Sequence, residues 1–304
     1  MSHHWVLIEE RCNIRLSWRT VIISNKCKLS YKNNYMIVRN DEVKMVHLSE
    51  INTLVIDTTQ VSITTLLMCE LLNRKIKIIF CDERHNPKGE VMSYYGSHNT
   101  SKKVIQQSKW TDKTKSVIWQ RIVKQKITNQ SKVLRIYKKP NHEKLMEYVE
   151  QVEVNDVSNR EGHSAKVYFN SLFGMEFNRG LESNINSALD YGYSILLSSL
   201  NKEITSNGYI TQLGINHRSE FNQFNLGCDL MEPFRPIVDK LVYQNKEFEF
   251  NKDFKYKLIN VLNEKIIING GEYYVSNAIP LYVNSIFKAL ESGRPEDIVD
   301  IRVA

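Results

Sequence analysis

Hydrophobic residues in the first third of the chain recur in short runs with the two-residue period of strands. β-Branched and aromatic runs alternate with polar turns from Trp18 to Tyr95, a pattern typical of half-buried strands. The predicted strands are Thr20–Ser24, Tyr35–Val38, Lys44–Leu48, Thr53–Ile56, Ile76–Cys81 and Val91–Tyr95. One helical pattern interrupts them at Ser62–Asn73, with Ser62 as the expected N-cap. We therefore expect a β-rich domain with one packed helix over residues 17–95.

The hydrophobic period lengthens to about 3.6 residues beyond residue 110, which predicts helices. The predicted helices cover residues 112–130, 142–152, 159–173, 184–206, 229–244, 253–264 and 276–291. Residues 96–109, rich in Ser and Lys, are the expected linker, and residues 1–16 are an N-terminal extension of unknown role. The sequence thus predicts an α+β protein in which an all-α domain, residues 110–304, follows the β-rich domain.

The chain is basic, and its excess positive charge is concentrated in the first half. It has 41 basic and 34 acidic residues, of which residues 1–160 hold 27 basic and 16 acidic. Twelve basic residues lie between Lys102 and Lys139, against Asp112 alone. This asymmetry favours a polyanion-binding side, where phosphate contacts would give salt-dependent, sequence-tolerant binding. A solvated helix face accounts for the same stretch equally well.

Cysteine spacing and hydropathy argue against several other protein classes. The five cysteines form no CxxC pair and leave an odd one over, which argues against a disulfide framework and a structural zinc site. No segment approaches the ~20 apolar residues of a membrane span, and Glu9 and Glu10 stand where a signal peptide would continue its apolar region. We expect a cytoplasmic bacterial protein without membrane contact.

Two carboxylates and one imidazole in the helical region are candidate ligands for a divalent metal. Glu161 follows Asn159-Arg160, His217 ends Gly-Ile-Asn-His, and Glu232 precedes a proline. Carboxylate oxygens suit Mg²⁺ or Mn²⁺, and one imidazole favours Mn²⁺ tolerance without requiring Zn²⁺. In a basic protein, such a site is suited to chemistry on phosphodiesters.

Each candidate ligand also has a structural interpretation. Ser158 and Glu161 fit a capping box, in which the Glu side chain reaches back to the helix start. Glu232 has the position of an acidic residue in the first turn of a helix, ahead of prolines, where acidic residues are common. His217 fits a surface histidine, and His163 is a second candidate imidazole only two positions from Glu161. The residue pattern by itself leaves both interpretations open.

Longer strings in the chain resemble a known family. These strings are SWRTVIISNKCKLSYKNNYMIV, SNREGHSAKVYFNSLFG, NSALDYGYSILL and GINHRSEFNQFNLGCDLMEPFRPIVDKLVYQN. They are similar to the CRISPR-associated integrase, the catalytic subunit of the spacer-acquisition complex, most specifically to its type II form of the II-A kind. The resemblance runs from Ser17 to about residue 245 and is weaker beyond. It implies the same domain order and makes Glu161, His217 and Glu232 the three metal ligands.

Polar residues beside these ligands are candidates for supporting roles. Asp229 lies one helical turn before Glu232 and would orient His217 or a metal-bound water. The basic residues that adjoin the ligand segments could bind DNA phosphates or pair with the local acids. These basic residues are Arg160, Lys166, Arg218 and Arg235.

The resemblance implies an enzyme of CRISPR adaptation, the antiviral defence that inserts short foreign DNA duplexes into a CRISPR array. It would be an Mg²⁺- or Mn²⁺-dependent integrase and endonuclease whose reaction is transesterification by a DNA 3′-hydroxyl. The implied partners are prespacer and leader–repeat double-stranded DNA, a second copy of the chain, and the small CRISPR-associated protein two. Type II relatives also work with the effector nuclease and an end-binding ring protein. Homodimer contacts would use the strand edges of the β-rich domain.

Two other functions remain possible from the sequence. A structure-selective nuclease for branched DNA would use the same metal site. A non-catalytic, architectural DNA-binding protein would use the basic residues 102–139, with the acids merely capping helices.

Overall fold

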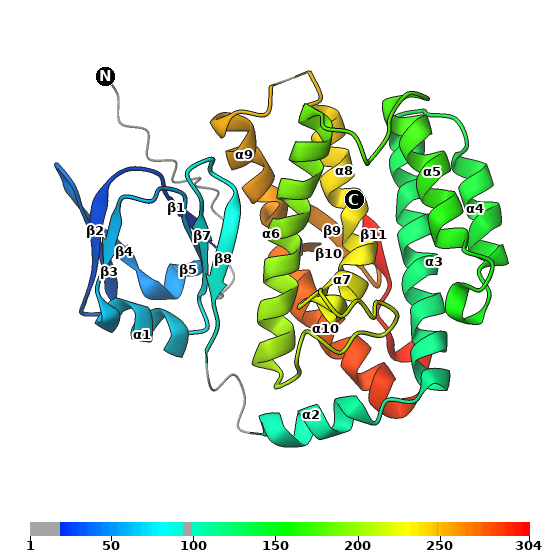
Figure 1. The fold of residues 1–304 in the computed structure, drawn as a ribbon, viewed down its shortest axis with the longest axis horizontal. Coiled ribbons are helices and arrows are strands. Elements are labelled where there is room, and N and C mark those ends of the chain that lie inside the picture. The colour runs from blue at the N-terminus through cyan, green and yellow to red at the C-terminus, as the bar shows by residue number, and fades with distance from the viewer. Residues whose placement is uncertain (1–18, 94–98, 248) are drawn as a thin grey trace. The chain divides into compact units, whose positions relative to one another are not determined.

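The chain divides into two compact units, Met1–Tyr94 and Tyr95–Ala304. The computed structural model describes residues 19–93, 99–247 and 249–304, so the expected N-terminal extension, residues 1–16, lies outside the described residues. Strands dominate the first unit and helices the second (Figure 1). The observed class is therefore α+β, as the hydrophobic periods predict.

Two four-stranded sheets and one α-helix build the N-terminal unit over residues 19–93. One sheet has the order β1-β5-β7-β8 and consists of Arg19–Ile23, Ile51–Ile56, Lys77–Cys81 and Pro87–Val91. The other has the order β4-β3-β2-β6 and consists of Val43–His47, Tyr35–Arg39, Cys27–Lys32 and Val61–Ile63. Helix α1, Thr65–Asn73, follows β6 and covers a core that includes the fully buried Leu29, Leu54 and Leu67.

Several details of this unit differ from the sequence prediction. Strand β2, CKLSYK, was not predicted although its apolar and polar residues alternate as in a half-buried strand, and strand β6 was not predicted because it has only three residues. Strand β8 ends at Val91, where the last predicted strand begins. The N-cap of α1 is Thr64, whose hydroxyl accepts a hydrogen bond from the Leu67 amide at 3.4 Å, and not Ser62.

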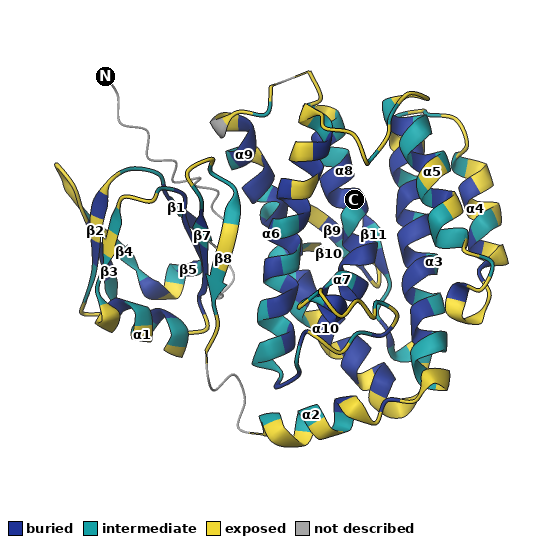
Figure 2. Cartoon of the chain, in the orientation of Figure 1, coloured by how far each residue is buried: buried dark blue, intermediate teal, exposed yellow. Residues whose placement is uncertain are grey.

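Eight helices of eight residues or more form most of the described part of the second unit. They are α2 Thr100–Ser108, α3 Asp112–Ile136, α4 His142–Gln151, α5 Arg160–Phe173, α6 Asn184–Ser206, α8 Arg235–Gln244, α9 Lys252–Ile259 and α10 Val275–Ser292. The seven-residue α7, Asn225–Met231, lies between α6 and α8 and continues into the 3₁₀ turn Glu232–Phe234. The 25-residue α3 contacts α4, α5, α8 and α10. Helix α10 contacts both α3 and α6, and all three helices carry many buried residues (Figure 2).

Two features of the second unit depart from the prediction. Residues 100–108, expected within the linker, form α2. The helical domain also contains a small antiparallel sheet, so it is not all-α; its strands are β9 Lys265–Ile268, β10 Gly271–Tyr274 and β11 Ile301–Val303. Asn269 and Gly270, with φ of 48° and 86°, make the turn between β9 and β10, and an Asn-Gly pair is a common hairpin turn.

Helices α6 and α8 approach each other closely beside the candidate ligands. A Cβ atom built on Gly192 of α6 would lie 2.5 Å from Val238 Cγ1 of α8. This contact needs a residue without a side chain, and it fixes the distance between Tyr193 and the side chains of α8. None of the helices in the described residues combines the length and hydropathy that a membrane span requires.

Candidate functional site

Helices α3, α5, α6 and α8 surround a cavity of about 270 Å³ that contains all three candidate ligands. Glu161 lies in the first turn of α5, His217 in the loop between α6 and α7, and Glu232 in the 3₁₀ turn between α7 and α8. The lining residues are Lys126, Gln130, Glu161, Ala165, Phe169, Arg179, Tyr193, His217, Glu232, Arg235 and Asp239. The fold thus brings three segments that are distant in sequence to one cavity.

The start of α5 leaves the Glu161 carboxylate available to the cavity. Asn159, not Ser158, is the N-cap, and its Oδ1 accepts a hydrogen bond from the Gly162 amide at 3.3 Å. Asp156 accepts hydrogen bonds from the Arg160 and Glu161 amides at 2.8 and 3.0 Å. The capping-box interpretation of Ser158 and Glu161 is therefore wrong, because two other side chains satisfy the helix start.

Glycine at position 162 is required by this cap. A Cβ atom there would lie 2.8 Å from Asn159 Oδ1, the atom that accepts the amide hydrogen bond. A larger residue would displace the cap and with it the first turn that carries Glu161.

Glu232 is a buried carboxylate held by two cations. Its Oε1 accepts a hydrogen bond from Arg235 Nε at 2.8 Å, and its Oε2 pairs with the ammonium of Lys126. Burial by itself would raise the pKa of Glu232, but the charges of Arg235 and Lys126 outweigh it and lower the pKa to about 2. Glu232 is therefore ionised at neutral pH.

Lys126 joins the two candidate acids. Its ammonium pairs with both Glu161 and Glu232, although the side chain is almost completely buried. Burial opposes the charged form, but the two carboxylates raise the pKa of Lys126 above its ordinary value. A cation therefore already lies against both carboxylates, and without it their negative charges would repel one another.

Asp229 holds the His217 loop and the His217 ring. Its fully buried carboxylate accepts hydrogen bonds from the amides of Ile215, Asn216 and His217 at 2.6, 3.1 and 3.1 Å. It also contacts His217 Nδ1 at 2.6 Å, and this hydrogen bond raises the pKa of His217. Since Nδ1 is engaged, Nε2 is the ring nitrogen available to a metal, the arrangement usual for metal-binding histidines.

The donor set suits Mg²⁺ or Mn²⁺, but it is not arranged as a coordination sphere. Within residues 19–93, 99–247 and 249–304, no three His, Cys, Asp or Glu side chains lie close enough to share an ion. The ammonium of Lys126 contacts both Glu161 and Glu232. Two carboxylates and one imidazole are appropriate ligands for these ions. Because Lys126 already contacts both carboxylates, a metal bound to them would displace its ammonium.

The other basic candidates differ in their relation to the cavity. Arg235 lines it and stacks over the Tyr193 ring at 4.6 Å. Arg218 is exposed and pairs with Asp112 at 3.0 Å. Arg160 lies over the Tyr148 ring at 5.3 Å, Lys166 is exposed, and neither lines the cavity. The runner-up imidazole, His163, is also exposed and outside the cavity.

Two cavity residues, Lys126 and Asp239, were missed by sequence reasoning. Lys126 lies among the buried apolar positions of α3, such as Ile122 and Ile127, and a lysine on such a face is the signal that could have identified it. Asp239 is buried and accepts a hydrogen bond from the Tyr193 hydroxyl. Burial raises the pKa of Asp239 to about 6.

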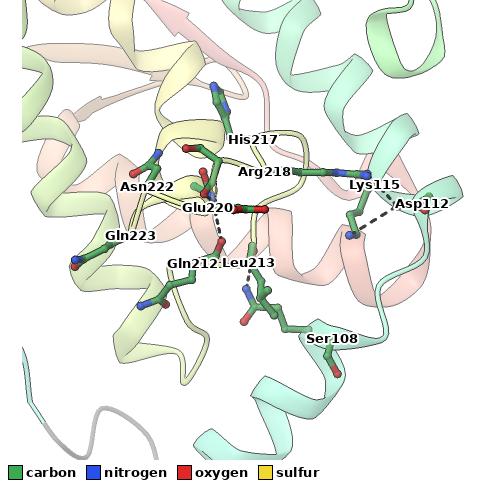
Figure 3. A pocket seen from close by; sticks show the side chains of 14 residues that line it. Ser108, Asp112, Lys115, Gln212, Leu213, His217, Arg218, Glu220, Asn222 and Gln223 are labelled. Carbon is green, nitrogen blue, oxygen red and sulfur yellow. Dashed lines mark hydrogen bonds and ion pairs between the residues drawn. The ribbon is translucent and has the colours of Figure 1, made fainter.

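A larger, polar groove of about 550 Å³ adjoins the cavity, and His217 lines both (Figure 3). The loop from Gln212 to Asn225 forms one side, and the ends of α2 and α3 that meet near Ser108 and Asp112 form the other. The site therefore extends past the three candidate ligands along the surface of the helical unit.

Comparison with known proteins identifies the family. The family described as "CRISPR associated protein Cas1" matches residues 20–266. The CRISPR-associated endonuclease Cas1 of Neisseria meningitidis serogroup C (strain 8013) is 32% identical over 277 residues, which cover 89% of this chain and 91% of that protein. The Cas1 1 protein of Francisella tularensis subsp. novicida (strain U112) is 27% identical, over 86% of this chain and 89% of that protein.

Solved structures share the fold at low sequence identity. A Cas1 protein from Thermotoga maritima superposes with a TM-score of 0.72 at 17% identity, over 90% of this chain and 97% of that one. A casposase bound to an integration product also gives 0.72, at 18% identity, over 90% and 91%. A chain of a Cas6-RT-Cas1–Cas2 complex gives 0.71 at 17% identity, over 97% of this chain and 37% of that one. The chain belongs to the Cas1 family of CRISPR-associated endonucleases.

Proposed function

We propose that this chain is the metal-dependent DNA integrase and endonuclease of a type II, II-A-like spacer-acquisition complex. It joins the 3′-hydroxyl of a short DNA duplex to a phosphodiester of the CRISPR repeat by direct transesterification. The observation that carries the proposal is the convergence of Glu161, His217 and Glu232 on one cavity. Membership of the Cas1 family supports it.

In this proposal Glu161, His217 and Glu232 hold Mg²⁺ or Mn²⁺. A metal held there would supply a Lewis acid for the scissile phosphodiester. Asp229 fixes the orientation of the His217 ring through Nδ1. Arg235 and Lys126 line the same cavity, where their charges would offset the negative charge of the reacting phosphate.

The proposed partners are double-stranded DNA, a second copy of the chain, and a protein of the Cas2 kind. The relation of the fold to a chain of a Cas1–Cas2 complex and to a casposase bound to its integration product supports this choice. The type II effector nuclease and the end-binding ring protein are proposed only from the resemblance to type II sequences.

A strand-transfer assay tests the proposal. The purified chain, its small partner and Mn²⁺ are mixed with a 3′-hydroxyl duplex and a DNA that carries the leader and repeat, and joined products are expected. Glu161→Ala, His217→Ala and Glu232→Ala each lower the rate on the order of 10²-fold or more, because each removes a group that acts on the developing charge. His163→Ala, which removes an exposed imidazole outside the cavity, leaves the rate unchanged.

Two outcomes would replace the proposal. Cleavage of branched DNA without joined products would identify a structure-selective nuclease. DNA binding without any metal-dependent reaction, unchanged in Glu161→Ala and Glu232→Ala, would identify an architectural DNA-binding protein.

A further inference from the structure

We propose that Gln130 is a second partner for Lys126: when a metal binds the two candidate acids, the Lys126 ammonium moves from them to the carboxamide oxygen of Gln130. This inference rests on the proposed function, because it assumes that the two acids hold Mg²⁺ or Mn²⁺. Gln130 is then a positioning residue, since it acts on the site through Lys126. The four side chains involved line one cavity of about 270 Å³; they are Lys126, Gln130, Glu161 and Glu232.

Gln130 carries a buried hydrogen-bond acceptor that has no partner. Its side chain is 2% exposed, and its Oε1 makes no hydrogen bond within the described part of the chain. A buried polar atom without a partner costs free energy, so its presence beside a cavity calls for an explanation. Gln120 on the same helix, by contrast, donates a hydrogen bond from Nε2 to the carbonyl oxygen of Val152 at 2.7 Å. The Gln130 carboxamide oxygen is therefore available to a donor inside the cavity.

Helical spacing places this acceptor next to Lys126. Both residues lie on α3, and side chains four positions apart on a helix are neighbours, with Cβ atoms about 5–6 Å apart. Helical side chains lean toward the N-terminus of their helix, so the side chain of Gln130 leans toward the turn that carries Lys126. The last torsion of a glutamine side chain is broad, which lets Oε1 turn toward an approaching donor. The ammonium can therefore reach the carboxamide without any movement of α3.

A metal on the two acids would leave the Lys126 ammonium in need of a new partner. The ammonium pairs with Glu161 and Glu232, and the Lys126 residue is only 6% exposed. An unpaired charge in a buried position is strongly unfavourable. A divalent cation on the carboxylates would also repel the ammonium at short range. The affinity of the site for a metal therefore depends on where the displaced ammonium goes.

Gln130 suits the displaced ammonium better than the third carboxylate of the cavity. That carboxylate, Asp239, lies on α8 and already accepts a hydrogen bond from the Tyr193 hydroxyl. Gln130 lies on the same helix as Lys126, and its neutral oxygen binds an ammonium less strongly than a carboxylate does. The exchange between the two acids and Gln130 is therefore reversible, and the charge of Lys126 stays in the cavity, where it would face the reacting phosphate.

Calorimetric titration of the chain and its small partner with Mn²⁺ tests the inference. Gln130→Met keeps the length of the side chain but removes the acceptor, so the Kd for Mn²⁺ should rise about tenfold, the effect of one hydrogen bond to a charged group. In a Lys126→Met background the same change should leave the Kd unchanged, because no ammonium then needs a second partner. This non-additivity distinguishes a partner of Lys126 from a residue that acts on the metal directly.

The melting temperature in EDTA separates this role from a purely structural one. Gln130→Met should melt at or above the wild-type temperature, because the change removes a buried acceptor that has no partner in the metal-free protein. Gln120→Met is the matched control: it removes the hydrogen bond to Val152, so it should lower the melting temperature and leave the Kd for Mn²⁺ unchanged. The melting temperature and the Kd of Gln130→Met test the inference even without the double variant.

The inference is overturned by an unchanged Kd in Gln130→Met, by an equal rise of the Kd in both backgrounds, or by a lower melting temperature of Gln130→Met in EDTA. Coupling of Lys126→Met to Asp239→Asn in place of Gln130→Met would assign the ammonium to Asp239 and overturn it as well. Strand transfer is measured in the same samples. Joined products without coupling between Lys126 and Gln130 refute only this inference. Coupling in a sample that binds Mn²⁺ but yields no joined product supports the inference and refutes the proposed reaction.

Discussion

Lys126 shows how a single side chain can neutralise two neighbouring acids. Its ammonium contacts Glu161 and Glu232, and the side chains of Lys126 and Glu232 are buried. Removing one partner of a buried ion pair leaves the other charge unpaired and typically lowers the unfolding free energy by ~3–5 kcal/mol. Lys126 therefore links the stability of the metal-free protein to the charge of the site.

This link predicts a metal-dependent stability for Lys126→Met. In EDTA the variant should lose about 3 kcal/mol of unfolding free energy, because Glu161 loses its cation and Glu232 keeps only Arg235. Mn²⁺ should then raise the melting temperature of the variant more than that of the wild type, since no ammonium competes for the carboxylates. Calorimetry with and without Mn²⁺ measures both effects. Lys124→Met on the same helix is the control, and equal Mn²⁺ shifts in wild type and Lys126→Met would contradict the interpretation.

Asp239 predicts a pH dependence of stability. Burial raises its pKa from the ordinary 3.8 to about 6, so between these values the folded protein keeps a proton that the unfolded chain has lost. The stability that Asp239 contributes is fully present below pH 3.8, the pKa of this group in the unfolded chain. It is lost as the pH rises through about 6, the pKa in the folded protein. A shift of this size corresponds to roughly 3 kcal/mol.

Asp239→Asn should remove that pH dependence because asparagine does not ionise. Relative to wild type, the variant should gain up to about 3 kcal/mol of unfolding free energy between pH 4 and pH 7. Urea unfolding in EDTA at a series of pH values measures the difference. Asp253→Asn, a change at an exposed acid of α9, should run parallel to wild type; a parallel curve for Asp239→Asn would show that Asp239 does not titrate in this range.

The sequence located the candidate ligands more readily than their surroundings. Strings around Glu161, His217 and Glu232 resemble a family, whereas the alternative of a capping box could be rejected only from the hydrogen bonds of Asn159 and Asp156. Lys126 and Asp239 could not be assigned from sequence, because their roles depend on contacts between α3, α5, α6 and α8.

At the scale of elements, α2 connects the segment after the β-rich unit to the His217 loop. Gln107 of α2 is buried, and its Nε2 donates hydrogen bonds to the carbonyl oxygens of Ile210 and Leu213, both at 2.9 Å. Its Oε1 accepts one from the Ile210 amide at 3.0 Å. One side chain thus holds the chain just before Gly214-Ile215-Asn216-His217.

Gln107→Leu should therefore weaken Mn²⁺ binding at the site without disrupting the fold. Loss of three hydrogen bonds frees the segment that leads to His217, so the Mn²⁺ concentration for half-maximal strand transfer should rise about tenfold, as for other residues that support a metal ligand. The circular dichroism spectrum should stay unchanged. Gln106→Leu, the neighbouring amide of α2, is the control, and a lower rate at every Mn²⁺ concentration with an unchanged half-maximum would contradict this role.

Long elements were predictable and short ones were not. Helices α3, α5, α6 and α10 keep an apolar period over many residues, and their predicted ranges overlap the observed ones closely. Helix α2 was expected as linker because its nine residues, TSKKVIQQS, are mostly polar and few of them are buried. Strands β9 to β11 have three or four residues each, too few for a period to be recognised.

At the scale of the whole molecule, the twelve basic residues between Lys102 and Lys139 do not form one surface. Lys103 pairs with Glu291 at 2.7 Å, Arg121 lies 3.5 Å from Asp300, and Lys126 is inside the cavity. A count of charges along the sequence could not separate these residues from exposed ones such as Lys109 and Lys138. The density of the stretch therefore overstates the charge available to DNA.

The two units have separate cores, which predicts two unfolding transitions. Leu54→Ala removes a fully buried side chain from the core of the first unit, and Leu134→Ala does so in α3 of the second. Each substitution should lower the unfolding free energy of its own unit by about 2–5 kcal/mol, and each should shift a different calorimetric transition to lower temperature. Leu66→Ala, at an exposed position of α1, should leave both transitions in place. A single transition that shifts with both core changes would show that the units unfold together.

The contact between Gly192 and Val238 limits how the sequence of this chain can diverge. Helices α6 and α8 meet where a single added methyl group would overlap an isopropyl group. A lineage that gains a side chain at position 192 must lose volume at position 238, or else shift the helix that carries Arg235 and Asp239. These two positions should consequently drift as a coupled pair, and a laboratory library randomised at both should yield active clones only where their combined volume stays near that of glycine plus valine.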